Sequence, residues 1–138
     1  MRDKLPCGKG KTLLVVEDSP SNLELLRELF QSLGFEVLTA STANEGLKVL
    51  TLCRPDLILL DIQLPSTNGL QFARHLKEDP RTNHIPIIAV TALAMEGDRE
   101  RILAAGCDGY IPKPTDLQIL LEEVARHLSK EREDGSQC

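Results

Sequence analysis

The chain has 138 residues, a length that suits one compact domain rather than two. Hydrophobic residues make up 41% of it and charged residues 27%, which is typical of a globular protein and excludes a disordered or collagen-like one. The formal net charge of −5 argues against electrostatic binding of nucleic acid or of an anionic membrane. No apolar run reaches the ~18 residues of a membrane span and no signal peptide pattern opens the chain, so we expect a cytoplasmic protein without membrane insertion.

Cysteine and histidine spacing excludes several kinds of site. The four cysteines are scattered with no C-x-x-C pair, so neither a disulfide framework nor a zinc site is expected. The three histidines do not recur at i, i+4 spacing beside acids, as a metalloprotease helix would require. We therefore expect reduced thiols and no histidine-based metal centre.

Five short apolar runs are predicted to be strands, and together they indicate a parallel sheet. They cover residues 12–16, 35–40, 56–60, 85–90 and 109–111. Most of these runs are continuously apolar rather than alternating, which is typical of strands covered on both faces. The run over residues 35–40 is expected to be an edge strand.

Helical patterns lie between and after these runs. Leu26, Leu29, Phe30 and Leu33 recur at helical spacing, with Gly34 as the stop of the first helix. Thr42 opens a second helix through a capping box with Glu45. Three further helices are predicted over about 69–77, 95–105 and 117–128. The predicted domain thus spans residues 12–128, after a flexible leader over 1–11 and before a fraying tail over 129–138.

This strict alternation of strands and helices predicts an α/β fold. The expected architecture is a doubly wound, five-stranded parallel sheet with five helices distributed over both faces. Right-handed crossovers leave few topologies, and we favour the flavodoxin-like strand order 2-1-3-4-5. Ligands in such sheets bind beyond the carboxyl ends of the strands.

Polar residues follow four of the five predicted strands. Glu17 and Asp18 follow the first strand, Asp61 the third, Thr91 the fourth and Lys113 the fifth. Each alone could be a helix cap, a turn residue or a surface charge. Together, three carboxylates in one pocket need a cation, because two charges ~4 Å apart repel by about 4 kcal/mol at an effective dielectric near 20. An all-oxygen ligand set favours Mg²⁺ over Ca²⁺ or Zn²⁺.

These residues occur in motifs that resemble a known family. The motifs are Val15-Val16-Glu17-Asp18, Leu64-Pro65-x-x-Asn68-Gly69, Val90-Thr91-Ala92 and Tyr110-Ile111-x-Lys113-Pro114, with Asp61 between the first two. From about residue 12 to 128 the chain resembles the receiver domain of two-component response regulators. Residues 89–114 are similar to single-domain regulators and to receivers of hybrid histidine kinases.

The resemblance implies a phosphoacceptor switch rather than a conventional enzyme. Asp61 would accept a phosphoryl group from a histidine kinase or a histidine phosphotransfer protein, and would lose it by autodephosphorylation. Mg²⁺ would be held by Asp61, Glu17, Asp18 and the backbone carbonyl of Gln63. Lys113 would pair with the phosphoryl oxygens.

The resemblance also implies how the switch acts on other proteins. Thr91 would hydrogen-bond to a phosphoryl oxygen. We predict that Tyr110 responds to the movement of Thr91, although a tyrosine at this place can also be a core ring with its hydroxyl at the surface. The resulting change would alter the face that binds a downstream effector. Leu25 lies off the buried stripe of the first helix and is a candidate anchor for the phosphohistidine partner, although an isolated exposed leucine is also common in proteins without that role.

Two alternatives use related folds. A haloacid-dehalogenase-like phosphatase would need a second aspartate two residues after the nucleophile, where this chain has Gln63. A flavodoxin-like cofactor-binding module would need a phosphate-cradling loop after the first strand, where this chain has the charged residues Glu17 and Asp18.

Overall fold

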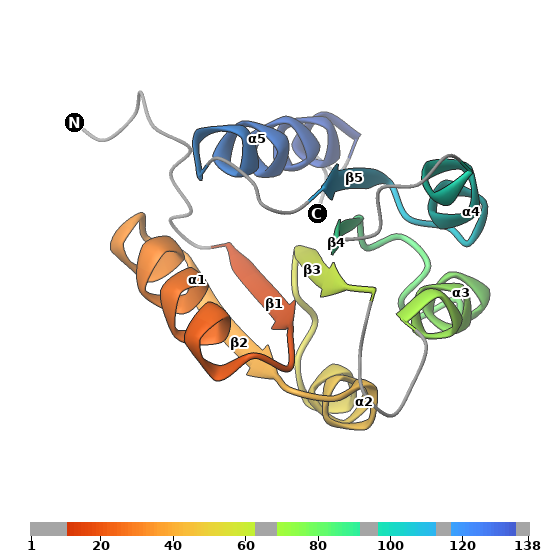
Figure 1. The fold of residues 1–138 in the computed structure, drawn as a ribbon, viewed down its shortest axis with the longest axis horizontal. Coiled ribbons are helices and arrows are strands. Elements are labelled where there is room, and N and C mark those ends of the chain that lie inside the picture. Colours follow the sequence, from red (N-terminus) through yellow and green to blue (C-terminus); the bar gives the residue numbers. More distant parts are fainter. Residues whose placement is uncertain (1–10, 63–68, 92–96, 113–116, 135–138) are drawn as a thin grey trace.

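The computed structural model describes residues 11–62, 69–91, 97–112 and 117–134, which form a layered α/β fold (Figure 1). Its sheet has the order β2-β1-β3-β4-β5, and neighbouring strands pair in parallel. The predicted order and the edge position of β2 are thereby confirmed. The strands are β1 (Thr12–Val16), β2 (Glu36–Ala40), β3 (Leu57–Asp61), β4 (Ile87–Thr91) and β5 (Gly109–Pro112).

Helices cover both faces of the sheet, as predicted. Helices α1 and α5 pack on one face, and α2, α3 and α4 pack on the other (Figure 1). Within the described ranges, no helix is long and apolar enough to cross a membrane. The helices are α1 (Pro20–Ser32), α2 (Ala43–Leu52), α3 (Gly69–Glu78), α4 (Asp98–Ala104) and α5 (Leu117–Asp134).

The sheet separates two apolar cores. Leu14 and Val16 of β1 belong to the core under α2, α3 and α4, whereas Leu13 and Val15 belong to the core under α1 and α5. Every residue of β3 and β4 is buried. Continuous apolar runs are therefore needed here, because successive side chains of a strand point to opposite faces and both faces are covered.

Four residues start and stop the first two helices, and the three that the sequence predicts, Thr42, Glu45 and Gly34, have the expected roles. The Ser19 hydroxyl accepts a hydrogen bond from the amide of Asn22 (3.4 Å), which caps α1. Thr42 accepts from the amide of Glu45 (3.1 Å), and the Glu45 carboxylate accepts in return from the amide of Ser41 (2.7 Å). Gly34 follows α1 with φ of 97°, a conformation that favours glycine.

The bounds of the last two helices differ from the prediction. Helix α4 begins at Asp98 rather than at residue 95, because Gly97 has φ of 92° and so is not helical; residues 92–96 lie outside the described part. Helix α5 continues to Asp134, six residues beyond the predicted end at Leu128. The charged residues of this extension are good helix formers, so a polar sequence does not by itself end a helix.

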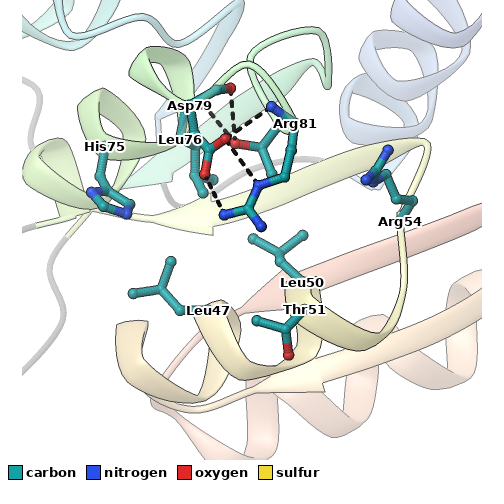
Figure 2. A pocket seen from close by; sticks show the side chains of 9 residues that line it. Leu47, Leu50, Thr51, Arg54, His75, Leu76, Asp79 and Arg81 are labelled. Carbon is teal, nitrogen blue, oxygen red and sulfur yellow. Dashed lines mark hydrogen bonds and ion pairs between the residues drawn. The ribbon is translucent and has the colours of Figure 1, made fainter.

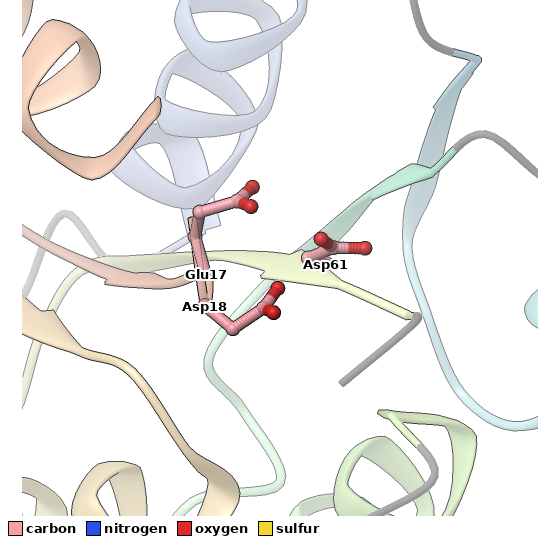
Figure 3. Close-up of side chains that lie close together, drawn as sticks. All are labelled: Glu17, Asp18 and Asp61. Carbon is pink, nitrogen blue, oxygen red and sulfur yellow. The ribbon is translucent and has the colours of Figure 1, made fainter. Parts of the chain in front are cut away.

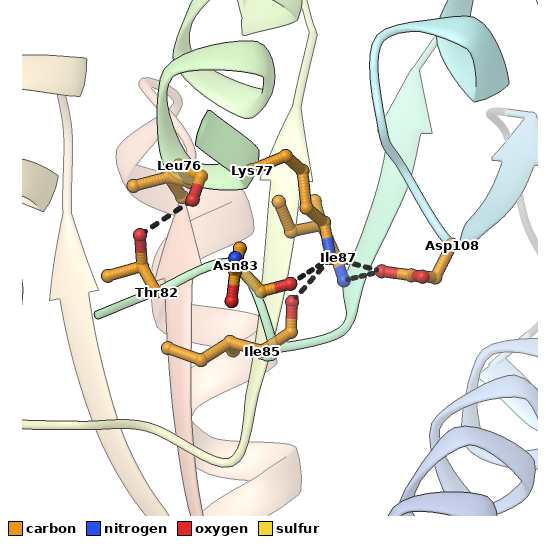
Figure 4. Close-up of polar contacts among 7 residues, drawn as sticks. All are labelled: Leu76, Lys77, Thr82, Asn83, Ile85, Ile87 and Asp108. Atoms are coloured by element: carbon orange, nitrogen blue, oxygen red, sulfur yellow. Dashed lines mark hydrogen bonds and ion pairs between the residues drawn. The ribbon is translucent and has the colours of Figure 1, made fainter. Parts of the chain in front are cut away.

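Two aspartates fix the ends of strands at the edge opposite the predicted site. Asp56, just before β3, accepts a hydrogen bond from the amide of Thr12 (2.8 Å). Asp108, just before β5, accepts from the amide of Ile87 (2.9 Å) and from the ammonium group of Lys77 (2.9 Å) (Figure 4). These contacts join α3 to β4 and β5 and help to hold the strands in register.

Both described cysteines are free thiols, as expected. Cys53 is exposed and Cys107 is buried. Burial raises the pKa of the Cys107 thiol to about 12, so this thiol stays protonated at neutral pH.

Candidate functional site

Three carboxylates meet at the carboxyl edge of the sheet. Glu17 and Asp18 follow β1, and Asp61 ends the neighbouring strand β3. Figure 3 shows their side chains converging from these two strand ends. One carboxylate oxygen from each of the three lies within 4.8 Å of the others. The structure therefore brings together the acidic residues that the sequence placed at these strand ends.

The three carboxylates differ in burial. Glu17 is 3% exposed and Asp61 is 6% exposed, whereas Asp18 lies at the surface. Burial weakens the solvation of a charge, and like charges held this close repel one another. The cluster is therefore suited to a cation, and its oxygen-only ligands are those that Mg²⁺ and Ca²⁺ prefer. Among these three residues, Asp18 is the most accessible to an arriving ion.

Backbone contacts hold the first carboxylate of the cluster in place. The amide of Glu17 donates to the carbonyl of Ala40 at the end of β2 (3.0 Å). Its carboxylate accepts a hydrogen bond from the amide of Ser19 (3.3 Å). Because Ser19 also caps α1, the start of that helix and the orientation of Glu17 are fixed together.

A glycine packs against the strand end that carries Asp61. The amide of Gly69, the first residue of α3, donates to the carbonyl of Ile62 (3.0 Å). A Cβ at Gly69 would lie 2.6 Å from the Cα of Ile62 and 3.0 Å from the carbonyl oxygen of Asp61. In the sequence, Gly69 stands at the start of a predicted helix, and this position alone does not indicate the close approach to Ile62.

The predicted switch residues lie on the next two strands. Thr91 ends β4 and is fully buried, one residue after Val90, which is in register with Asp61. Tyr110 of β5 is half-buried, in register with Ala89, and packs against the core under α2, α3 and α4. Both side chains are thus part of the sheet region beside the carboxylate cluster.

The remaining predicted site residues are Lys113, Gln63 and Leu25. Lys113 and Gln63 lie outside the described residues. Leu25 is on α1 and is 51% exposed, as expected for a residue off the buried stripe. On that stripe Phe30 is buried, and Leu23, Leu26, Leu29 and Leu33 pack against the core between α1, α5 and the sheet.

Comparisons with known proteins point to one family. A family model, the response regulator receiver domain, matches residues 13–125. The polar-differentiation response regulator DivK of Brucella anthropi is 43% identical over 118 residues, which cover 86% of this chain and 96% of that protein. Neither the phosphatase nor the flavodoxin-like alternative is favoured by these matches.

Solved structures agree with this match. The signal receiver domain of a histidine kinase from Syntrophus aciditrophicus is 35% identical with a TM-score of 0.81, covering 87% of this chain and 91% of that one. The receiver domain of a sensor histidine kinase from Pseudomonas aeruginosa is 32% identical with a TM-score of 0.79, covering 86% and 98%. The latter structure holds a magnesium ion in its active site cleft.

Proposed function

This chain belongs to the response regulator receiver domains, the phosphoacceptor switches of two-component signalling, and on that premise we propose that Asp61 is its phosphoacceptor. The observation that carries the proposal is the convergence of Glu17, Asp18 and Asp61, whose carboxylate oxygens lie within 4.8 Å of one another. Asp61 ends a buried central strand, which presents its carboxylate at a fixed place. The leader over residues 1–11 and the receiver domain over 12–128 are part of the same proposal, and helix α5 extends past residue 128 to Asp134.

The chain binds a divalent metal ion, and we propose that Mg²⁺ is this ion. Glu17, Asp18 and Asp61 would hold it, together with the backbone carbonyl of Gln63. A bound Mg²⁺ supplies positive charge next to the phosphoryl oxygens. The donor set supports this assignment, because it offers only oxygen atoms from residues near one strand edge.

The chain's own residues carry the transfer. A carboxylate oxygen of Asp61 attacks phosphorus as the bond between phosphorus and the donor's histidine nitrogen breaks. The Lys113 ammonium group pairs with the phosphoryl oxygens, and the Thr91 hydroxyl donates a hydrogen bond to one of them. Burial of Thr91 at the end of β4 supports this role, since a buried hydroxyl keeps a defined place beside the site.

The partners follow from the family. A histidine kinase or a phosphotransfer protein supplies the phosphoryl group, and an effector protein reads the phosphorylated state. We propose that the donor docks beside α1, where Leu25 is exposed.

Phosphorylation with a small donor tests the assignment of Asp61. The purified chain is incubated with acetyl phosphate and Mg²⁺, and labelling is followed by intact mass. We expect one phosphoryl group on the parent and none on Asp61→Asn. Asp56→Asn is the matched control, because Asp56 precedes the same strand at the opposite edge of the sheet. Labelling of Asp61→Asn at the parental rate, or loss of labelling in Asp56→Asn alone, would refute the assignment.

A further inference from the structure

A cavity of about 280 Å³ lies between α2 and α3, away from the carboxylate cluster. Figure 2 shows residues of both helices around it, with Arg54 and Arg81 in the segments that follow them. Its volume is just below the roughly 300–1,000 Å³ typical of small-molecule sites. Towards the other end of these helices, α2 and α3 approach closely, because a Cβ at Gly46 would lie only 3.1 Å from the ring of Phe72.

The inner lining of this pocket is apolar. Leu76 is 1% exposed, and Leu47 and Leu50 pack as half-buried residues against the same core. Thr82 is also buried there, but its hydroxyl already donates to the carbonyl oxygen of Leu76 (2.7 Å). A ligand with an apolar body could therefore displace water from this lining without leaving the Thr82 hydroxyl unpaired.

The rim of the pocket is cationic in a chain of net charge −5. Arg81 is bound to Asp79 through two guanidinium contacts of 3.2 and 3.0 Å, and its amide donates to the same carboxylate (2.9 Å). These contacts lower the pKa of Asp79 to about 2, so at neutral pH its negative charge offsets the positive charge of Arg81. Arg54, also on the rim, makes no hydrogen bond or ion pair with any residue of the described structure.

His75 is a further polar residue of the rim. The carboxyl ends of α2 and α3 carry partial negative charge, which repels an anion. The cationic side chains, and Arg54 above all, must therefore supply any attraction for a negatively charged ligand.

We propose that this pocket binds a small organic anion, whose apolar body lies on Leu47, Leu50 and Leu76 and whose acidic group is held by Arg54. The site is separate from Asp61 and does not require phosphorylation. Its chemistry differs from that of the carboxylate cluster, which attracts cations.

The test is an NMR titration of the unphosphorylated chain with naphthalene-1-sulfonate, a probe with an apolar body and one negative charge. We expect amide shifts concentrated in residues 47–54 and 75–82 at probe concentrations of about 1 mM. Naphthalene methanol and naphthylmethylammonium have the same ring system without the negative charge, and they should bind more weakly.

Two variants should change the affinity in opposite directions. Arg54→Gln should weaken sulfonate binding about threefold to fivefold, because it removes the unpaired cation of the rim. Asp79→Asn should strengthen binding by a similar factor, since it removes a negative charge and releases the Arg81 guanidinium group. Arg99→Gln on α4 is the matched control, because it makes the same charge change at an exposed residue outside the pocket.

Three results would overturn the proposal. The first is equal binding of naphthalene-1-sulfonate and naphthalene methanol, which would indicate an apolar patch that does not recognise the negative charge. The second is an equal effect of Arg54→Gln and Arg99→Gln. The third is a shift pattern that lies mainly outside residues 47–54 and 75–82. All three variants change exposed or half-buried side chains, so they should fold, and their amide spectra show directly whether they do.

Discussion

Gly69 and Ile62 make backbone contact at the end of β3: the Gly69 amide donates to the Ile62 carbonyl at 3.0 Å. A Cβ at Gly69 would lie 2.6 Å from the Ile62 Cα, closer than real Cβ contacts. Among the described glycines, those with positive φ are Gly34, Gly97 and Gly106, so Gly69 is needed for close approach and not for its φ. This contact joins the start of α3 to the residue after Asp61.

Replacing this glycine should therefore disturb both the fold and the site. We expect Gly69→Ala to lower the free energy of unfolding by about 1–3 kcal/mol, because the added methyl group must push the backbone of β3 and α3 apart. The displaced Asp61 should also be phosphorylated more slowly by acetyl phosphate. Urea unfolding followed by circular dichroism and mass-based labelling measure the two effects.

Gly106→Ala separates the effect on stability from the effect on the site. A Cβ there would lie 2.5 Å from the Lys77 Cγ, and Gly106 has φ of 111°, so this variant should also lose stability. It lies at the opposite edge of the sheet, before β5, so the folded variant should keep its labelling rate. Equal labelling rates for Gly69→Ala and Gly106→Ala would contradict the role of Gly69.

Metal binding should stabilise the fold through the carboxylate cluster. Mg²⁺ at ten times its dissociation constant should add about 1.4 kcal/mol of stability, which corresponds to a rise in Tm of a few degrees. Asp18→Asn should remove most of this rise, because Asp18 is the exposed member of the cluster and its charge is lost. Thermal unfolding with Mg²⁺ or with a chelator measures the shift.

Glu78→Gln is the control for this experiment, because Glu78 is an exposed carboxylate at the end of α3 and outside the cluster. It should keep the full rise in Tm. An unchanged Tm of the parent at millimolar Mg²⁺, or an equal rise in Asp18→Asn, would argue against the proposed metal ligands.

The positions of the strands could be predicted because they depend on a short-range pattern, and the strand order was favoured because right-handed crossovers leave few topologies. Apolar runs mark the strands, and parallel strands bring their carboxyl ends to one edge, so Glu17 and Asp61 had to lie near each other. Asp56 and Asp108 each stand just before a strand, and each accepts a hydrogen bond from the first amide of the neighbouring strand. The sequence therefore contains an aspartate just before each of these two strands, which marks where the strand begins.

Other features depend on contacts between distant parts of the chain. The distance between Gly69 and Ile62 and the pocket between α2 and α3 follow from how the helices pack, which no local pattern specifies. The end of α5 was predicted too early for a different reason. Its last charged residues have good helix propensity, but they show no apolar periodicity that would mark them as helical.

Leu25 should contribute to transfer from the phosphohistidine partner and not to phosphorylation by small donors. It is 51% exposed on α1, and truncation of an apolar anchor in an interface typically costs about 1–2 kcal/mol, or roughly 5- to 30-fold in affinity. Leu25→Ala should therefore slow transfer from the phosphorylated cognate kinase while the rate with acetyl phosphate is unchanged. Leu52→Ala, at an 84% exposed leucine of α2, is the control and should leave both rates unchanged. Equal slowing with both donors would indicate a structural effect and would refute the docking role.

Thr91 and Tyr110 should be coupled when Asp61 is phosphorylated. Thr91 is fully buried at the end of β4, and Tyr110 lies half-buried on the adjacent strand β5. If the Thr91 hydroxyl moves towards the phosphoryl oxygen, the space that it leaves allows the Tyr110 ring to turn inward, which changes the face formed by α4, β5 and α5. Such coupling is typically worth about 1–3 kcal/mol, enough to change the affinity for an effector about 5- to 150-fold.

Beryllofluoride bound at Asp61 mimics the phosphoryl group, so NMR spectra with and without it report this coupling. In the parent we expect shifts at the carboxylate cluster, along α4 and at Tyr110. In Thr91→Ala the shifts near Asp61 should remain while those at α4 and Tyr110 collapse, because the hydroxyl that links the two regions is gone. Thr51→Ala, at an exposed threonine of α2, should keep the complete pattern. Full transmission to Tyr110 in Thr91→Ala would show that the signal reaches this face by a route that does not pass through Thr91.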